Sequence, residues 1–418
     1  TVCVGKNYVD QASVKSVREA IKNNDFDAVI PNYIDLDQYR KNGGYQIAEQ
    51  VREGMINNDQ IIKTLKESGL KGKGGAGFPT GMKWEIVSKY EGKKYVAVNG
   101  DEGEPGTFKD RSYLEKDPHR FLEGALIASL FIKASNVYIY MRDEYPAVIK
   151  ILKDEILKLE NENIIPAGHF IIRRGAGAYI CGEESAMIES IEGKRGLPRH
   201  RPPYVAEVGL FNSPTLTNNL ETLFWIRDII EKGSEWFAEK GVSGNKGFHS
   251  FSVSGRVREP GVKVAPAGVT IQELIDDYCG GMKEDHIFKG YLPGGASGGI
   301  LPASMNNIPL DYGSKELTEA GCFLGSAAIV VLSDKDSMKD VALNLLKFFE
   351  EESCGQCTPC RVGTEKTVKL MKEKIWNKEK LADLSEVMSQ ASICGLGQAA
   401  TNPLNSVLKY FGNEISYE

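Results

Sequence analysis

Residues 352–363 read ESCGQCTPCRVG and place Cys354, Cys357 and Cys360 at C-x-x-C-x-x-C spacing. A fourth cysteine, Cys394, stands alone in the later stretch ASICGLGQ. Three thiolates at this spacing converge on one small volume, and one distant cysteine completes a four-thiolate shell that suits a single 4Fe-4S cluster. Structural zinc usually takes its four ligands from two separated pairs, which differs from the three-plus-one spacing here. Zinc and an inert structural set of cysteines are the alternatives. Because a cluster carries electrons one at a time, we expect the rest of the chain to hold a redox partner.

The composition is that of a globular protein with several domains, since 41% of the 418 residues are hydrophobic and 26% are charged. The formal net charge is -6 without a sustained run of lysine and arginine, which argues against a nucleic-acid function. The apolar stretches fall far short of the roughly 20 residues that span a bilayer. Half of the eight cysteines belong to the cluster motif, which fits a reducing compartment. We expect a soluble cytoplasmic protein without a secretory signal, peripheral to the membrane only through partners, with residues before Thr1 either missing or removed by processing.

Four regions follow from the pattern of apolar and polar residues. A helical and irregular segment comes first and includes a helix from Asp59 to Gly69. An α/β region follows, then a small mixed sheet with one helix, and finally a helical bundle around the cysteines. The expected boundaries are 1–68, 69–240, 241–333 and 334–418.

Within the second region, short β-branched and apolar runs alternate with helical stretches, as in a layered parallel sheet. The expected strands are 94–99, 136–141 and 169–174, and the expected helices begin near Pro118, Tyr145 and Gly182. Ligands of such sheets bind beyond the carboxyl ends of the strands. The residues after each strand are therefore candidate binding residues.

A glycine-rich stretch, GKGGAGFPTG, opens the α/β region and matches G-x-G-x-x-G through Gly72, Gly74 and Gly77. It follows a helix rather than a strand, so we reject an ordinary Rossmann fingerprint. Glycines at this density still let backbone N–H groups approach a phosphate or a flat ring. Positive charge is supplied nearby by Lys71, Lys73 and Lys83. A tight surface turn is the alternative.

Acidic residues follow the expected strand 94–99 in the stretch GDEGEPGTFKDR. The candidates are Asn99, Asp101, Glu102 and Glu104. Their oxygens could accept hydrogen bonds from ribityl or ribose hydroxyls, bind a metal or act as a catalytic base, while a solvated acidic turn is the alternative.

Two further motifs open helices. RGAGAYICGEES follows a strand and puts Gly182, Glu183 and Glu184 at a helix start, where backbone donors can bind an anion. NNLET, residues 218–222, carries side chains that can donate and accept, with helix capping as the alternative.

Together these six motifs, in this order, resemble the NADH-binding flavoprotein subunit of respiratory NADH:quinone oxidoreductase, which NAD-reducing hydrogenases and NAD-dependent formate dehydrogenases share. The resemblance runs from Gly69 to the C-terminus. It implies FMN, a site for NAD(H) and one 4Fe-4S cluster. It also implies a modified Rossmann-like α/β flavin domain, a ubiquitin-like β-grasp module and a helical cluster domain.

The resemblance implies a role for each matching residue. FMN would contact Gly72, Lys73, Gly74, Lys83, Asn99, Asp101, Glu102, Gly182, Glu183, Asn218, Asn219 and Thr222. NAD(H) would contact Phe78, Glu104, Glu184, Arg201 and Tyr204. The cluster ligands would be Cys354, Cys357, Cys360 and Cys394. The chain departs from the family at Lys71 and Lys73, where arginine is common, and at Ile86, a position that is commonly aromatic.

The implied function is that of a diaphorase subunit. NADH gives up two electrons as a hydride and a cluster takes one, so FMN is expected between them, with Glu102 and Glu184 as supporting groups and no catalytic nucleophile or base. The sequence of several stretches is most similar to that of soluble NAD-dependent formate dehydrogenases, with respiratory NADH:quinone oxidoreductase or NAD-reducing hydrogenase as the alternative. Implied partners are a thioredoxin-like 2Fe-2S subunit and a large iron-sulfur subunit, which carries a molybdenum cofactor in the formate dehydrogenase branch.

Two other classes stay open at this point. A zinc-stapled nucleotide-binding regulator would use the same cysteines and glycines without redox chemistry, and a pure electron-carrying subunit would hold iron but no flavin. The remaining cysteines are expected to be buried structural thiols: Cys3, Cys181, Cys279 and Cys322.

Overall fold

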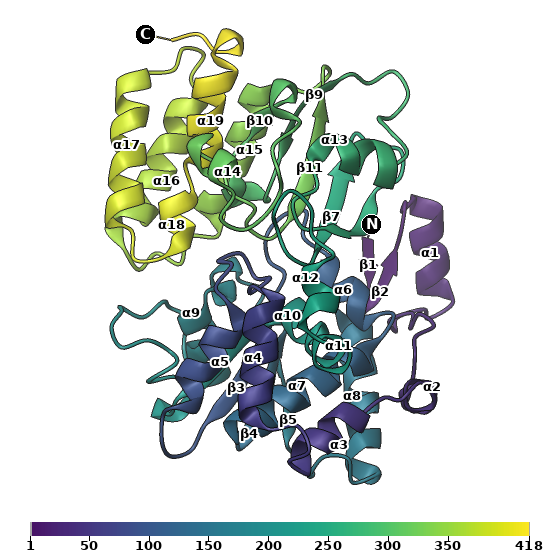
Figure 1. Cartoon of the computed structure of the whole chain (residues 1–418). Helices are drawn as coiled ribbons and strands as arrows, with labels where there is room; N and C mark the ends of the chain where they lie inside the picture. Colours follow the sequence, from purple (N-terminus) through teal and green to yellow (C-terminus); the bar gives the residue numbers. More distant parts are fainter. Residues whose placement is uncertain (1, 418) are drawn as a thin grey trace.

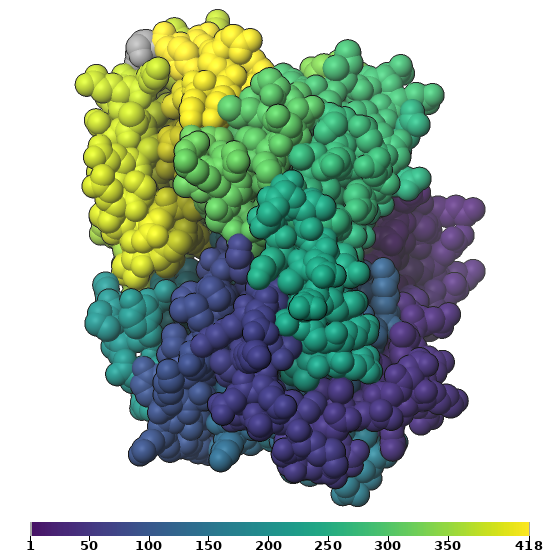
Figure 2. All heavy atoms as spheres, viewed as in Figure 1, coloured from purple at the N-terminus to yellow at the C-terminus, as the bar shows by residue number. Residues whose placement is uncertain are grey.

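The computed structural model describes residues 2–417 and contains a parallel sheet, a mixed sheet and a C-terminal helical bundle (Figure 1). The parallel sheet and its helices form one half of the molecule, while the mixed sheet and the bundle lie side by side in the other half (Figure 2). No helix in this described part combines the length and the apolar character needed to cross a membrane. The mixed α/β architecture with a helical C-terminus agrees with the sequence analysis.

The first segment contains a hairpin that the sequence analysis missed. β1 (Val2–Val4) pairs antiparallel with β2 (Asn7–Val9), where we expected only helices and polar loops. Strands of three residues are too short to show a periodic pattern. The helices that follow are α1 (Val14–Lys22), α2 (Leu36–Lys41), α3 (Gln46–Arg52) and α4 (Asn58–Ser68).

Helix α4 confirms the expected helix 59–69. Asn57 and Gln60 form a capping box at its start, and Gly69 ends it in the left-handed region with φ 70°. Ile61 and Leu65 are buried in the same core as the parallel sheet. The core of the sheet therefore begins before the expected boundary at residue 68.

The parallel sheet has the order β5-β4-β3-β6, and every neighbouring pair is parallel. Its strands are β3 (Tyr95–Gly100), β4 (Asn136–Met141), β5 (Phe170–Arg174) and β6 (Thr215–Asn219). The first three confirm the expected strands. β6 was missed because its sequence, TLTNN, has no apolar alternation.

Eight helices accompany this sheet in the described chain. They are α5 (Thr80–Ser88), α6 (Lys109–Leu114), α7 (Pro118–Ile132), α8 (Pro146–Asn161), α9 (Glu184–Ile191), α10 (Leu220–Phe224), α11 (Ile226–Lys232) and α12 (Ser234–Ala238). Side chains of β3 alternate between two cores, as strand geometry requires. Val96 and Val98 face the core that contains α7, whereas Tyr95 and Ala97 face a second core shared with Phe349 of the C-terminal bundle. This face of the sheet and part of the bundle therefore belong to one hydrophobic cluster, which also includes Met187 of α9.

The mixed sheet has the order β10-β9-β11-β7-β8. Its strands are β7 (Phe248–Gly255), β8 (Gly261–Pro266), β9 (Phe288–Leu292), β10 (Leu301–Pro302) and β11 (Ala328–Ser333). Only β7 and β11 pair in parallel, and the other neighbours are antiparallel. The expected single helix begins at Thr270 as α13 (Ile271–Glu273), continues to Tyr278 as a π-turn, and is followed by α14 (Lys315–Glu319).

The C-terminal bundle follows β11 directly. Its helices are α15 (Met338–Glu351), α16 (Thr358–Met371), α17 (Lys378–Ala391), α18 (Gly395–Ala399) and α19 (Asn402–Tyr410). Ser337 caps α15 by accepting a hydrogen bond from the backbone N–H of Asp340. Pro359 lies in the first turn of α16, where its missing N–H costs no hydrogen bond within the helix. Cys354 and Cys357 lie in the loop before α16, Cys360 lies in the first turn of α16, and Cys394 directly precedes α18.

Candidate functional site

The predicted binding motifs meet at the carboxyl ends of β3 and β6. The chain runs from β3 to β4 and β5 on one side and then returns to β6 on the other, so the strand order reverses between β3 and β6. Such a switch point opens a crevice in which α/β sheets bind ligands. We call the residues around this point the crevice.

Hydrogen bonds join the four motifs there. Asn99 Nδ2 donates to the Gly182 carbonyl at 2.8 Å. The Lys73 backbone N–H donates to Thr222 Oγ1 at 2.9 Å. A Cβ added to Gly74 would lie 3.2 Å from Cβ of Asn219. The structure therefore brings together the segments that the sequence predicted separately.

Space remains beside two of the glycines. A Cβ added to Gly182 would meet only the Asp101 carbonyl oxygen, at 3.8 Å, and one added to Gly72 would meet nothing closer than 3.5 Å. Backbone with this much clearance can be approached closely by a flat ring or a phosphate. The crevice therefore offers open backbone on which a flat ring or a phosphate could lie.

A buried charge network lies under the crevice and was not anticipated as a unit. Lys109 Nζ bonds to Asp110 Oδ1 at 2.7 Å and to Glu221 Oε2 at 2.9 Å, and all three residues are buried. Asn219 Nδ2 donates to Asp110 Oδ2 at 2.7 Å, which ties the network to a predicted FMN contact. No local pattern in either stretch indicates a lysine buried between carboxylates.

Two crevice carboxyls have raised pKa values. Burial raises the pKa of Asp101 to about 7, against the opposing charge of Arg142. Burial, followed by the charge of Asp110, raises the pKa of Glu102 to about 7. Glu102 also accepts the backbone N–H groups of Asp110 and Arg111 at 2.8 and 3.0 Å, so it caps the start of α6.

Lys83 bonds to residues of α9 and β6. Its Nζ bonds to Glu184 Oε2 at 3.1 Å and to Thr217 Oγ1 at 2.7 Å. Burial acts to raise the pKa of Glu184, but Lys83, Thr217 and Arg201 outweigh it and lower that pKa. Arg201 bonds to Glu183, which in turn caps α9 through the backbone of Ser185 and Ala186. The charge of Lys83 thus pairs with a predicted nucleotide carboxylate, and its contact with FMN stays a prediction.

The Lys73 side chain bonds to the mixed-sheet half of the molecule. Its ammonium group is buried and donates to the Phe248 carbonyl at 2.6 Å and to His249 Nδ1 at 2.8 Å, both on β7. Burial lowers the pKa of Lys73 to about 8. In this arrangement only its backbone serves the glycine loop, because the side chain anchors that loop to the mixed-sheet half.

The predicted nucleotide contacts fall into two groups. Phe78 and Tyr204 are 45% and 57% exposed, so their rings are open to a ligand, and Ile86 is 39% exposed. Glu104 is instead buried, and its Oε1 accepts from the Ser297 backbone at 2.9 Å and from Ser297 Oγ at 2.6 Å. Burial raises the pKa of Glu104. Glu104 therefore joins the two halves of the molecule, a role that no local pattern signalled.

The four predicted cluster cysteines line one small hollow. Its walls include Ile180 and Pro198 from the parallel-sheet half and Ile393 and Leu396 from the bundle. Cys357 and Cys394 precede the first residues of α16 and α18, and burial raises the pKa of Cys394 to about 11.

The four thiols of the hollow do not meet at a single point. Among residues 2–417, no three Cys, His, Asp or Glu side chains are close enough together to hold a single ion. Zinc needs its sulfurs about 2.3 Å from one centre. Four cysteine thiols around one hollow are the ligand set that a 4Fe-4S cluster takes. Of the other cysteines, Cys181, Cys279 and Cys322 are buried as expected, but Cys3 is exposed.

One short turn runs from the crevice to the hollow. The turn Tyr179–Gly182 has Ile180 in the wall of the hollow and Gly182 bonded to Asn99 at the crevice. The Tyr179 N–H donates to Glu352 Oε2 at 2.9 Å, and its ring packs against Phe348 with the centroids 5.1 Å apart. The two predicted redox sites are thus adjacent.

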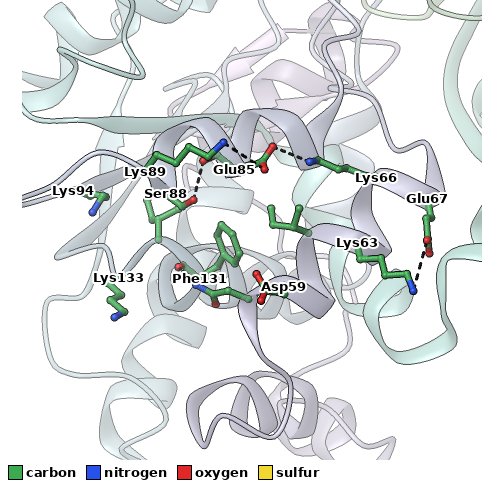
Figure 3. Close-up of a pocket in the computed structure, with 13 residues that line it drawn as sticks. Asp59, Lys63, Lys66, Glu67, Glu85, Ser88, Lys89, Lys94, Phe131 and Lys133 are labelled. Atoms are coloured by element: carbon green, nitrogen blue, oxygen red, sulfur yellow. Dashed lines mark hydrogen bonds and ion pairs between the residues drawn. The ribbon is translucent and has the colours of Figure 1, made fainter.

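A larger groove lies elsewhere, between α4, α5 and the end of α7 (Figure 3). It is lined by Lys94, just before β3, and Lys133, just before β4, so it faces the amino ends of these strands. Lys66 and Glu85 form an ion pair across it at 2.8 Å. It contains none of the predicted site residues, and we assign the function to the crevice and the hollow.

Comparison with known proteins identifies the family. Residues 65–228 match the Nuo51 FMN-binding domain, and residues 340–418 match the NADH-ubiquinone oxidoreductase-F iron-sulfur binding region. The second of the NADH-quinone oxidoreductase F subunits of Rhizobium meliloti (strain 1021) is 41% identical over 395 residues, which are 91% of this chain and 93% of that protein. The chain belongs to the family of NADH-quinone oxidoreductase F subunits.

Other members and a solved structure agree. The NADH-quinone oxidoreductase F subunit of Aquifex aeolicus (strain VF5) is 40% identical over 92% of this chain and 91% of its own length. A chain of the NAD+-reducing NiFe hydrogenase in the H2-reduced state has a TM-score of 0.84 at 30% identity and covers 97% of this chain and 72% of that chain. The cofactors are therefore FMN and a 4Fe-4S cluster, and the chain is an oxidoreductase of the NADH dehydrogenase type. These relatives lend no support to the formate dehydrogenase branch and favour the alternative, the respiratory or hydrogenase diaphorase.

Proposed function

We propose that this member of the F-subunit family exchanges hydride with NAD(H) at the crevice and passes single electrons through the cysteine hollow to partner subunits. The observation that carries the proposal is the turn Tyr179–Gly182, which borders both sites. FMN, when bound, accepts an electron pair and releases it one electron at a time.

The residues of the chain would position FMN and nucleotide. We propose that Gly72, Gly74, Asn219 and Thr222 hold FMN from the glycine-loop side, and that Asp101 and Glu102 lie near its polar groups. With pKa values of about 7, these two carboxyls are partly protonated at neutral pH and can donate as well as accept hydrogen bonds.

The nucleotide would enter from the exposed side. Phe78 and Tyr204 offer exposed rings, and Glu184 is held ionised by Lys83 and Arg201. A carboxylate fixed in this way can accept hydrogen bonds from ribose hydroxyls. Glu104, which accepts a hydrogen bond from Ser297, would form the inner wall of the nucleotide site.

For the assembly, we infer that the chain works in a respiratory NADH:quinone oxidoreductase or an NAD-reducing hydrogenase, with a thioredoxin-like 2Fe-2S subunit and a large iron-sulfur subunit as partners. The cytoplasmic location stays a prediction. We also propose that residues 241–333 form a ubiquitin-like β-grasp unit. The hairpin of β7 and β8, the following α13 and the return of β11 parallel to β7 support it.

A visible absorption spectrum with iron and flavin analysis tests the core of this proposal. One FMN and one 4Fe-4S cluster per chain, with rapid bleaching of the flavin band by NADH, is the expected result. Zinc without iron would favour the regulator, and iron without flavin would favour a simple electron carrier. Mass spectrometry of the co-purifying subunits separates the respiratory, hydrogenase and formate dehydrogenase assemblies.

A further inference from the structure

Both lysines of the K-G-K sequence that begins the glycine loop are anchored to one carboxylate in the mixed-sheet half. Lys71 Nζ donates to Asp311 Oδ2 at 2.8 Å and to the Tyr312 carbonyl at 2.6 Å. Lys73 reaches the same aspartate through His249. Asp311 follows these lysines by some 240 positions along the chain.

The protonation of His249 follows from its partners. An ammonium group can only donate, so His249 Nδ1 must accept from Lys73 Nζ at 2.8 Å. Nε2 then carries the ring proton and donates to Asp311 Oδ1 at 2.6 Å. Lys73, His249 and Asp311 are 2%, 1% and 5% exposed, so water does not replace these bonds.

The anchored loop lies between the mixed-sheet half and the crevice. On one side, the Lys73 backbone bonds to Thr222 and Gly74 lies against Asn219. On the other, Gly77 has a positive φ of 63°, and a Cβ there would lie 2.6 Å from Cβ of Tyr312. The loop has little room to shift without breaking the bonds to Asp311.

We propose that Asp311 and His249 are positioning residues that clamp the glycine loop against the crevice, so that the mixed-sheet half controls how fast FMN leaves. The inference rests on the proposed binding of FMN at the crevice. Neither residue belongs to the set expected to touch FMN, and both act through Lys71 and Lys73.

The test measures the rate of FMN release from the purified holoprotein, followed by the rise in free-flavin fluorescence. Asp311→Asn and His249→Leu should each release FMN at least about tenfold faster than wild type, as loss of a charge-assisted hydrogen bond predicts. His249→Gln keeps one neutral donor and one acceptor, so it should restore most of the retention. Asp336→Asn is the matched control. It removes a carboxylate that lies away from the glycine loop and forms an ion pair with Arg256 at 2.7 Å.

Release from Asp311→Asn and His249→Leu at the rate of the Asp336→Asn control would overturn the clamp. If Asp311→Asn does not fold, Lys71→Met gives the same test at a partly exposed side chain, and its release rate must then exceed the control. Failure of the wild-type protein to bind FMN at all would instead overturn the proposed function. An equal release rate for His249→Gln and His249→Leu would also count against the clamp, because only the former can bridge Lys73 and Asp311.

Discussion

The cysteine hollow and the crevice are built in opposite ways. Three of the four cysteines come from the stretch 354–360, and α16 begins immediately after Cys357. The crevice instead takes its residues from four segments between Gly72 and Thr222 and is braced by His249 and Asp311 from the other half of the molecule.

The surroundings of the two sites also differ. The hollow is walled by apolar side chains such as Ile180 and Leu396. The crevice instead lies next to the buried charges of Lys109, Asp110 and Glu221. A site made from a local motif should fail only when its ligands change, whereas a site assembled from distant segments should also fail when a remote support changes. The predictions below test this difference.

Cys357→Ser should cause the largest effect, a fall from about four iron atoms per chain to a small fraction of that, because one of four cluster ligands is lost. FMN should stay bound, since the crevice shares no ligand with the hollow. Iron and flavin analysis measures both, with the exposed Cys3→Ser as the control. Unchanged iron would remove Cys357 from the ligand set.

Lys109→Met should destabilise the parallel-sheet half by about 3–5 kcal/mol, because it leaves the buried carboxylates of Asp110 and Glu221 without their partner. Chemical denaturation followed by circular dichroism gives the value. Lys66→Met, which removes a largely exposed ion pair to Glu85, should change stability little. Equal losses of unfolding free energy in the two variants would mean that the buried network does not stabilise the parallel-sheet half.

Gly74→Val should weaken FMN binding at least about tenfold, or some 1.4 kcal/mol. The new side chain would begin 3.2 Å from Cβ of Asn219 and extend into the crevice. Equilibrium titration of the apoprotein with FMN measures the effect, and Gly74→Ala should show a smaller one. Iron content should not change. Full FMN affinity in folded Gly74→Val would move the flavin away from this loop.

Acid should loosen the crevice through His249. Burial, and then the charge of Lys73, lower the pKa of His249 from 6.5 to about 4, with Asp311 and Glu221 opposing the shift. The Tyr312 ring also faces it, 5.1 Å away between ring centroids. Because the pKa of His249 is depressed in the folded protein, neutral His249 stabilises the closed loop fully above pH 6.5. This stabilisation is lost as the pH falls toward 4, and the equilibrium constant for loop opening rises by up to about tenfold per pH unit.

The release of FMN should therefore accelerate several-fold between pH 6.5 and pH 5, again measured by flavin fluorescence. In His249→Gln this part of the pH dependence should disappear, because glutamine does not titrate. A pH profile that is the same in both proteins would show that another group governs release.

Cys360→Ala should have the smallest effect on the crevice. Single-turnover bleaching of the flavin band by NADH should stay within about twofold of wild type, and ferricyanide reduction should continue, because hydride transfer needs only nucleotide and FMN. Delivery of electrons to the partner subunits should fail. Loss of bleaching in a folded variant that retains FMN would show that the hollow shapes the crevice and that the two sites are not separable.

Much of this protein can be predicted from its sequence because the decisive information is local. The cysteine spacing, the glycine loop and the polar residues after each strand are short patterns whose chemistry depends on near neighbours, and the structure brings them to two adjacent places. β3, β4 and β5 were predicted for the same reason, since a buried strand carries its own apolar run.

Other features depend on partners far away along the chain. The polar strand β6 is held by its pairing with β3, and no pattern within TLTNN indicates it. The direction of the Lys73 side chain is set by His249, some 175 positions later, and Glu104 is buried by Ser297, some 190 positions later. Whether a charged group faces a ligand or a buried partner depends on which arrangement desolvates it at the lower cost, and that comparison exists only once both halves of the molecule are packed together.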